Sequence, residues 1–457
     1  MLTAVNPATG ETVREVTPDT DEQVEAKLAA SLKAYHEWKE KSFSERGDLL
    51  KAVAKHMRDN VETLAPIMTE EMGKPINEAR GEVNKGAWCA EHYADNAEAY
   101  LTRQVIESDA TVSYVQHLPI GPILGILPWN APFWLAFRFC APSLMAGNSA
   151  LMKHDPHVPG CALAIEQCFR AVGAPEGLFQ ALMIETPRVE AVMRDKRVRG
   201  VSFTGSSRGG SKVAEIAGSE IKPAVLELGG SDPSIVLADA DLEKAADVLT
   251  LSRIINAGQS CIAAKRIIVE DSVYDRMKDL LSAKLRALKV GNPKLEETDV
   301  GPIARKDLRA ELDRQVRTSI SEGATCLFGG EVPEGDGYFY PVTLLADVTP
   351  DMTAFKEETF GPVGVLIKAR NEEHALELAN DTEYGLAASV WTKAERGQEM
   401  ARRIEAGQVS VNGIVKTDPR LPSGGIKSSG LGRELGPHGI MEFVNAQQVW
   451  VGPVQGG

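Results

Sequence analysis

The stretch ILGILPWNAPFWLAFRFCAPSLMAGNSALM, residues 123–152, decides the fold class. Its two short apolar runs, ILGIL (123–127) and SALM (149–152), enclose a longer segment with a helical pattern. Two apolar runs separated by a helix are typical of a strand–helix–strand unit, in which the two strands lie parallel in one sheet. The stretch therefore predicts a parallel α/β fold.

The same alternation repeats outward from this stretch. Further strand-like runs are GVSF (200–203), AVLEL (224–228), SIVL (234–237), RIIV (266–269), VGVLI (363–367), AASVW (387–391) and QVSVN (408–412). Helical patterns cover residues 21–38 and 272–288. We therefore expect two α/β units in tandem. The tail EFVNAQQVWV (442–451) alternates like a strand, and we expect either an ordinary edge strand or a strand that pairs with another subunit.

Composition narrows the functional classes. With 64 acidic against 50 basic residues in 457, the formal net charge is −14, which disfavours nucleic-acid and anionic-membrane partners. The sequence has no apolar run long enough to span a bilayer and no export signal, so we expect a cytoplasmic protein. The six cysteines include no CxxC pair. We therefore expect free thiols and no metal centre.

One cysteine stands in a setting suited to catalysis. Cys261 ends the segment NAGQSC (256–261), among small and polar residues, whereas Cys140 lies in the apolar run FRFCAP. A thiolate is a strong nucleophile, but only about 3% of a thiol is ionised at pH 7 at its usual pKa of about 8.5. A nucleophilic Cys261 therefore needs a base or a positive field. The alternative is a structural thiol.

Two polar residues follow predicted strands. Glu227 interrupts the apolar run LELGG (226–230), and burial would raise its pKa toward the range of a base that works at neutral pH. Asn130 follows ILGIL, where an amide can donate to an oxyanion. Alternatively, Glu227 is a solvated or salt-bridged carboxylate and Asn130 forms a turn.

The segment FTGSSRGG (203–210) connects a predicted strand to a predicted helix. Its glycines would let a diphosphate approach a helix N-terminus, although the GxGxxG fingerprint is absent from the chain. The same residues contain GxSxG, which in a serine hydrolase would make Ser207 the nucleophile. Only His374 and His438 follow Ser207, and no HGGG-type segment is present, so this alternative is weak.

Six blocks in order resemble the aldehyde dehydrogenase superfamily. They are PWNAPF (128–133), FTGS (203–206) with Gly210, LELGG (226–230), GQSC (258–261), EETFGPV (357–363) and GGIKSSGLGRE (424–434). The resemblance covers nearly the whole chain and implies two Rossmann-like parallel α/β domains plus a β-strand oligomerisation arm. It implies a cofactor-binding domain at 1–100 and 120–227, a catalytic domain at 228–425, oligomerisation segments at 101–119 and 440–454, and a homodimer or homotetramer.

The resemblance also implies roles for individual residues. Cys261 is the expected nucleophile, Glu227 the general base, and Asn130 the oxyanion donor together with the Cys261 backbone N–H. NAD or NADP would accept hydride, and the resulting thioester would be hydrolysed. The expected cofactor-binding residues are Trp129, Lys153, Pro156, Gly205, Ser206, Gly210, Leu228, Glu358 and Phe360.

Within the superfamily the chain most resembles short bacterial succinate-semialdehyde dehydrogenases, through residues 133–148, 151–162 and 417–430. Arg138, a cation in an apolar aromatic segment, would bind the far carboxylate of the substrate. Alternatively, it forms a structural salt bridge. Thr417 stands where relatives have serine and keeps a hydroxyl for a carboxylate. Ser423 stands where relatives have phenylalanine and would make the pocket wall smaller and more polar. Another aliphatic or carboxylated aldehyde therefore remains an alternative substrate.

Three further interpretations remain. Pro156 stands where NAD-specific relatives often have glutamate, so NADP is allowed, although Asp155 would repel its phosphate if it faced it. A relative that transfers the acyl group to coenzyme A is disfavoured because Glu227 is retained for hydrolysis. A non-catalytic member of the superfamily is disfavoured because Cys261, Glu227 and Asn130 are all present.

Overall fold

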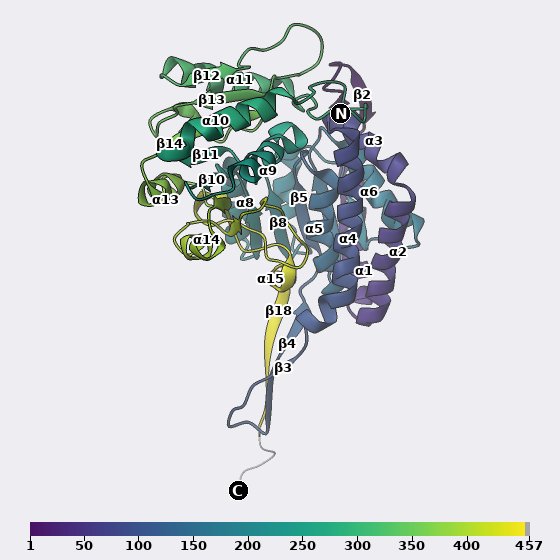
Figure 1. Cartoon of the computed structure of the whole chain (residues 1–457). Helices are drawn as coiled ribbons and strands as arrows, with labels where there is room; N and C mark the ends of the chain where they lie inside the picture. Colours follow the sequence, from purple (N-terminus) through teal and green to yellow (C-terminus); the bar gives the residue numbers. More distant parts are fainter. Residues whose placement is uncertain (453–457) are drawn as a thin grey trace.

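A computed structural model describes residues 1–452 and contains two mainly parallel β-sheets, each covered by helices on both faces (Figure 1). The first is a six-stranded sheet of order β17-β9-β8-β5-β6-β7. Its strands are β5 (Ile123–Leu127), β6 (Ala150–His154), β7 (Phe179–Ala181), β8 (Gly200–Thr204), β9 (Ala224–Glu227) and β17 (Gly430–Leu431). All pairs are parallel except β17 with β9.

Strand β5 shows why this sheet is covered on both sides. It is buried along its whole length, and its side chains alternate between two cores. Ile123 and Leu127 pack in the core formed with α2–α6, whereas Leu124 and Ile126 pack in the core formed with α1, α7 and α8. These helices are α1 (Asp21–Trp38), α2 (Phe43–Asp59), α3 (Val61–Met72), α4 (Ile76–Tyr100), α5 (Pro132–Met145), α6 (Pro159–Ala171), α7 (Val189–Arg194) and α8 (Ser207–Ser219). A two-stranded sheet, β1 (Leu2–Val5) and β2 (Thr12–Val16), packs beside them.

The second is a seven-stranded sheet of order β12-β13-β14-β11-β10-β15-β16. Its strands are β10 (Pro233–Val236), β11 (Arg266–Glu270), β12 (Thr325–Phe328), β13 (Thr343–Ala346), β14 (Val363–Ala369), β15 (Ala387–Trp391) and β16 (Gln408–Val411). Only β12 runs antiparallel to its neighbour. The covering helices are α9 (Leu242–Ile254), α10 (Asp271–Arg286), α11 (Lys306–Ser321), α12 (Thr353–Lys356), α13 (Glu372–Asn380) and α14 (Ala394–Ala401).

A third, three-stranded sheet projects from the body as an arm (Figure 1). It consists of β3 (Gln104–Val105), β4 (Val112–Pro119) and β18 (Val444–Val451), and β18 follows the short helix α15 (Gly436–Met441). Strand β18 pairs antiparallel with β4 of the same chain, from Val444 opposite Pro119 to Val451 opposite Val112. Of the two alternatives for the tail, the structure agrees with an edge strand, whose partner β4 is distant in sequence but adjacent in space. Residues 453 and 454 of the expected oligomerisation segment lie outside the described residues.

The predicted fold class is confirmed. Each quoted apolar run overlaps a strand, and the helical patterns at 21–38 and 272–288 correspond to α1 and α10. The prediction omitted the short strands β1, β2, β7, β12, β13 and β17. Strand β17 adds residues near the C-terminus to the edge of the first sheet. Within residues 1–452, no helix is both long enough and apolar enough to cross a membrane.

Candidate active site

The loop before Cys261 has an unusual backbone. It contains the short 3-10 helix η2 (Ile255–Gly258), in which Asn256, Ala257 and Gly258 have φ values of 55°, 54° and 74°. The left-handed conformation costs about 1–2 kcal/mol per residue with a side chain. A Cβ on Gly258 would lie 2.2 Å from the carbonyl oxygen of Gly361, so glycine is required there. The surrounding structure must therefore hold this loop in place.

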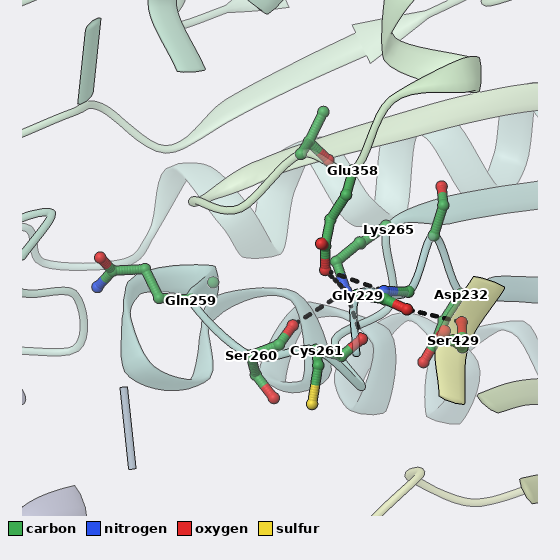
Figure 2. A network of polar contacts seen from close by, with 12 residues as sticks. Gly229, Asp232, Gln259, Ser260, Cys261, Lys265, Glu358 and Ser429 are labelled. Atoms are coloured by element: carbon green, nitrogen blue, oxygen red, sulfur yellow. Dashed lines mark hydrogen bonds and ion pairs between the residues drawn. The ribbon is translucent and has the colours of Figure 1, made fainter. Parts of the chain in front are cut away.

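Side chains from several elements hold the loop. The backbone N–H of Asn256 donates to Glu78 Oε2 at 2.7 Å. The Lys265 ammonium donates hydrogen bonds to the backbone carbonyls of Ser260, at 3.0 Å, and of Cys261. Figure 2 shows Lys265 between these carbonyls and Glu358, with the Cys261 sulfur on the side facing away from this network. The loop therefore presents the sulfur while its carbonyls are fixed from behind.

Cys261 lines a cavity of about 440 Å³. Of the other predicted site residues, Asn130, Arg138 and Thr417 line the same cavity, and so do Lys85 and Glu78, which the sequence did not single out. Asn130 Nδ2 donates to the carbonyl of Gln259 at 3.1 Å, two residues before Cys261. The amide predicted to stabilise an oxyanion is thus hydrogen-bonded to the loop that carries Cys261.

Glu227 is 3% exposed at the end of β9 and does not line the cavity. Its Oε2 accepts a hydrogen bond from Arg138 Nη2 at 3.0 Å, and its Oε1 has no hydrogen-bond partner among residues 1–452. Burial raises the pKa of Glu227 to about 7, with Arg138 opposing and Glu434 adding to that rise. This is the pKa of a carboxylate suited to general base catalysis at neutral pH.

Burial favours the protonated form of the Cys261 thiol. Burial raises its pKa to about 12, although the positive charges of Lys265 and Arg138 act in the opposite direction. A thiol in this state requires a base before it can attack. Burial also raises the pKa of the cavity-lining Glu78 to about 7. Sequence reasoning missed Glu78 because it lies in an ordinary polar helix, α4, with no motif around it.

Arg138 reaches the cavity from α5, but two carboxylates neutralise it. Its Nε donates to Glu434 Oε2 at 2.6 Å, and its Nη2 contacts both Glu434 and Glu227. The side chain is 3% exposed. These contacts match the structural salt bridge considered as the alternative for Arg138, and the predicted role as carboxylate anchor gains no support from them.

The predicted cofactor segments meet at the first sheet. Strand β5 pairs with β6 on one side and with β8 on the other, so the strand order reverses direction at β5. The crevice at the carboxyl ends of the strands at such a reversal is the usual ligand site of parallel α/β sheets. Trp129, after β5, packs its ring edge against Phe360 with centroids 5.9 Å apart. After β8, Ser206 caps α8 by accepting a hydrogen bond from the Gly209 N–H at 3.2 Å.

Glycine at position 210 is required by packing, because a Cβ there would lie 2.4 Å from Leu228 Cδ2. The predicted residue Gly205 has a similar constraint, since a Cβ there would lie 2.7 Å from the Phe203 ring. Both glycines therefore allow the start of α8 to lie close to its neighbours. Glu358 faces this region, with its Oε1 3.1 Å from Lys265 Nζ and 3.2 Å from the Gly230 nitrogen.

Lys153, at the end of β6, is 5% exposed and has no ion-pair partner among the described residues. Burial lowers its pKa, and Asp155 acts in the opposite direction. The Asp155 carboxylate accepts a hydrogen bond from the His157 backbone N–H at 2.9 Å and lies 2.7 Å from His157 Nδ1. Pro156 stands between them. A phosphate near Lys153 would therefore meet an unpaired cation and an acid already engaged by histidine.

The serine hydrolase alternative lacks its catalytic partners. Ser207 is the first residue of α8, and its hydroxyl donates to the backbone carbonyl of Ser428 at 3.3 Å. His374 lies in α13 and accepts from the Arg370 backbone N–H. Neither histidine that follows Ser207 forms a hydrogen bond with it. Within residues 1–452, no group of three or more His, Cys, Asp or Glu side chains is placed to hold a metal ion.

The two parallel α/β units bring the predicted nucleophile Cys261 and the predicted oxyanion donor Asn130 into one cavity. The model of the aldehyde dehydrogenase family matches residues 1–449, and the chain belongs to this family.

Full-length relatives support this assignment. The chain is 46% identical over 451 residues to a probable NADP⁺-dependent succinate-semialdehyde dehydrogenase of Synechocystis sp., covering 98% of this chain and 99% of that one. It is 43% identical to an NAD(P)⁺-dependent succinate semialdehyde dehydrogenase of Escherichia coli, covering 98% and 97%. The crystal structure of a succinic semialdehyde dehydrogenase from Streptococcus pyogenes with NADP⁺ superposes with a TM-score of 0.96, at 37% identity, covering 98% and 99%.

Proposed function

We propose that this aldehyde dehydrogenase oxidises succinate semialdehyde to succinate with NADP or NAD as hydride acceptor. The observation that carries the proposal is the cavity that combines the Cys261 thiol and the Asn130 amide with the half-buried Lys85 cation, which has no carboxylate partner among the described residues. A partly buried cation without a counter-ion favours an aldehyde that carries a negative charge. The names of the relatives from Synechocystis, Escherichia coli and Streptococcus pyogenes agree with this substrate.

In the proposed mechanism, Glu227 receives the Cys261 proton after turning away from Arg138, and the thiolate attacks the aldehyde carbon. The Asn130 amide and the Cys261 backbone N–H stabilise the oxyanion, and one such donor contributes about 3–4 kcal/mol. When bound, the nicotinamide accepts the hydride that converts the thiohemiacetal to a thioester. Glu227 first releases the Cys261 proton to solvent and then takes a proton from the water that hydrolyses this thioester, and this second proton passes to the departing Cys261 sulfur. The products are the carboxylic acid and the free thiol.

Both cofactors are proposed to bind at the six-stranded sheet. The unit formed by residues 1–100 and 120–227 would hold the dinucleotide, and the unit at 228–425 would supply the thiol. The buried Lys153 cation has no acidic partner among the described residues, which suits a 2′-phosphate. Its neighbour Asp155 is engaged by His157, which reduces repulsion of that phosphate. Glu358 would bind the nicotinamide ribose, and Trp129 and Phe360 would pack near the nicotinamide.

We also propose a homodimer or homotetramer in the cytoplasm. The arm exposes apolar side chains that a second copy would cover, namely Val105, Ile106, Val112, Leu118, Trp450 and Val451. Strand β18 lies at the edge of the three-stranded sheet and has a free edge for pairing. The six cysteines are free thiols, as in proteins of a reducing compartment.

A kinetic panel tests the substrate proposal. NAD(P)H formation would be followed at 340 nm with succinate semialdehyde and with butanal, its neutral counterpart of equal chain length, each with NADP and NAD. We expect kcat/KM to be at least about tenfold higher for succinate semialdehyde, because a charge-assisted hydrogen bond to a carboxylate contributes about 1.5–3 kcal/mol. Equal or higher values for butanal would overturn the proposal.

A further inference from the structure

The cavity that holds Cys261 is lined by four cationic side chains, Lys74, Lys85, Arg138 and Lys416. Three of them need no ligand. Lys74 forms an ion pair with Glu82, Arg138 is neutralised by two carboxylates, and Lys416 is exposed to solvent at the rim. Lys85 differs, because no carboxylate lies within ion-pair distance of its Nζ among residues 1–452.

Lys85 is held in a defined position. It comes from α4, and its Nζ lies 4.1 Å from the centroid of the Trp134 ring, in the geometry of a cation–π contact. The same nitrogen donates to Thr417 Oγ1 at 2.9 Å. Burial lowers the pKa of Lys85 to about 8, Arg138 lowers it further, and the more distant Glu82 and Asp418 act in the opposite direction.

These contacts satisfy Lys85 only in part. An ammonium group has three N–H donors, and the only hydrogen bond Lys85 makes with a described residue is to Thr417. A partly buried cation without a counter-ion is unfavourable, and an anion entering the cavity would remove that cost. The Thr417 hydroxyl accepts from Lys85, and its own O–H has no acceptor among the described residues. One carboxylate can therefore accept from both residues.

We propose that Lys85, together with Thr417, binds the distal carboxylate of the aldehyde and determines the preference for carboxylated over neutral aldehydes. This inference rests on the proposed function and specifies which cation performs the recognition. Arg138 then has a structural and electrostatic role. It holds Glu227 and Glu434, and a substrate carboxylate on its guanidinium would be the third anion there.

Substitution of Lys85 tests the inference. The quantity to measure is the ratio of kcat/KM for succinate semialdehyde to kcat/KM for butanal. We expect Lys85→Met to lower this ratio about 10- to 100-fold, the loss of a charge-assisted contact, mainly through KM for the acid substrate. Lys85→Arg keeps the charge and should retain the larger part of the ratio. Calorimetric binding of succinate should weaken at least about tenfold in Lys85→Met.

Lys416→Met is the matched control, because it removes the same charge from the exposed rim of the same cavity. We expect the ratio to change by less than about threefold there, as is usual for solvated charges. Thermal unfolding checks that each variant is folded, and Lys85→Gln replaces Lys85→Met if the latter is not.

The outcomes separate this inference from the proposed function. A wild-type enzyme that shows no preference for the carboxylated aldehyde contradicts the proposed function. A clear wild-type preference that a folded Lys85→Met or Lys85→Gln variant retains within about threefold contradicts the role of Lys85 alone. An equal effect of Lys416→Met also contradicts it, because a general loss of positive charge would then explain the result.

Discussion

Replacing Glu434 by glutamine should lower the pKa of Glu227 and shift the acidic limb of the pH–rate profile. Glu434 and Glu227 both contact Arg138 Nη2, so two carboxylates share one guanidinium nitrogen. Glu434 is among the groups that raise the pKa of Glu227. Glutamine keeps the shape and a hydrogen-bond acceptor but removes one negative charge. Arg138 remains paired with Glu227 in this variant.

The magnitude follows from this geometry. Carboxylate oxygens that share one nitrogen lie on the order of 5 Å apart, and unit charges at that distance repel by about 3 kcal/mol at an effective dielectric constant of about 20. That energy corresponds to roughly 2 pKa units; relaxation of Arg138 toward Glu227 acts in the same direction, whereas reorganisation of the site around the neutral glutamine reduces the effect. We therefore expect the pKa of Glu227 to fall by about 1–2 units from its raised value near 7.

The direction is set by the role of the base. A general base works when deprotonated, so the rate falls as pH decreases through its pKa. Lowering that pKa moves the acidic limb to lower pH. The assay is kcat between about pH 5 and 9 at saturating aldehyde and cofactor, with the NAD(P)H burst recorded to establish that thioester hydrolysis limits turnover.

Glu71→Gln is the matched control for this prediction. Glu71 is also a buried glutamate paired with an arginine, Arg14, but it accepts from the start of α6 and does not line the Cys261 cavity. Its substitution should leave the acidic limb in place. If the limb of Glu434→Gln does not move, or moves to higher pH, then Glu227 is not the titrating base or Glu434 does not control it.

Four further predictions concern the other site residues. Cys261→Ala should abolish NAD(P)H formation, and Glu227→Gln should slow both the thiol attack and the thioester hydrolysis, because Glu227 is the proposed base in both steps; full activity of Cys261→Ala would disprove covalent catalysis. Asn130→Ala should lower kcat about 100- to 1,000-fold as one oxyanion donor is lost, whereas a change confined to KM would indicate a binding role. Lys153→Met should weaken NADP binding, followed by nucleotide fluorescence, at least about tenfold more than NAD binding; equal losses would place the 2′-phosphate elsewhere.

Most of the fold was predictable because its signals are local. Buried parallel strands appear as short apolar runs, and β5 and β14 match the runs quoted from the sequence closely. The arm was not predictable to the same degree. Strand β18 alternates as expected, but its partner β4 lies more than 300 residues earlier in the chain, and pairing over such separations leaves no local signal. The two residues of β17 are too short to produce any pattern.

The site was predictable where a residue's role depends on its own motif. Cys261, Asn130, Arg138 and Thr417 do line one cavity. The ionic partners were not predictable, because Arg138 meets Glu227 and Glu434 across 89 and 296 residues of sequence. Lys85 contacts Thr417 across 332 residues. An isolated cation in a sequence is conspicuous, but only the folded chain determines which cation acquires acidic partners and which does not.

If Lys85 binds the substrate carboxylate, substrate recognition and acid–base chemistry depend on different cations, Lys85 and Arg138. If Arg138 bound the substrate carboxylate, each substrate would add a negative charge beside Glu227, raise its pKa, and weaken the pairing of both carboxylates with Arg138. Recognition at Lys85 places the new charge on the cation that lacks a carboxylate partner and leaves the Arg138 group intact. The acidic limb of the pH–rate profile should therefore coincide for succinate semialdehyde and butanal. A limb shifted upward by about one pH unit with the carboxylated substrate alone would instead indicate binding at Arg138.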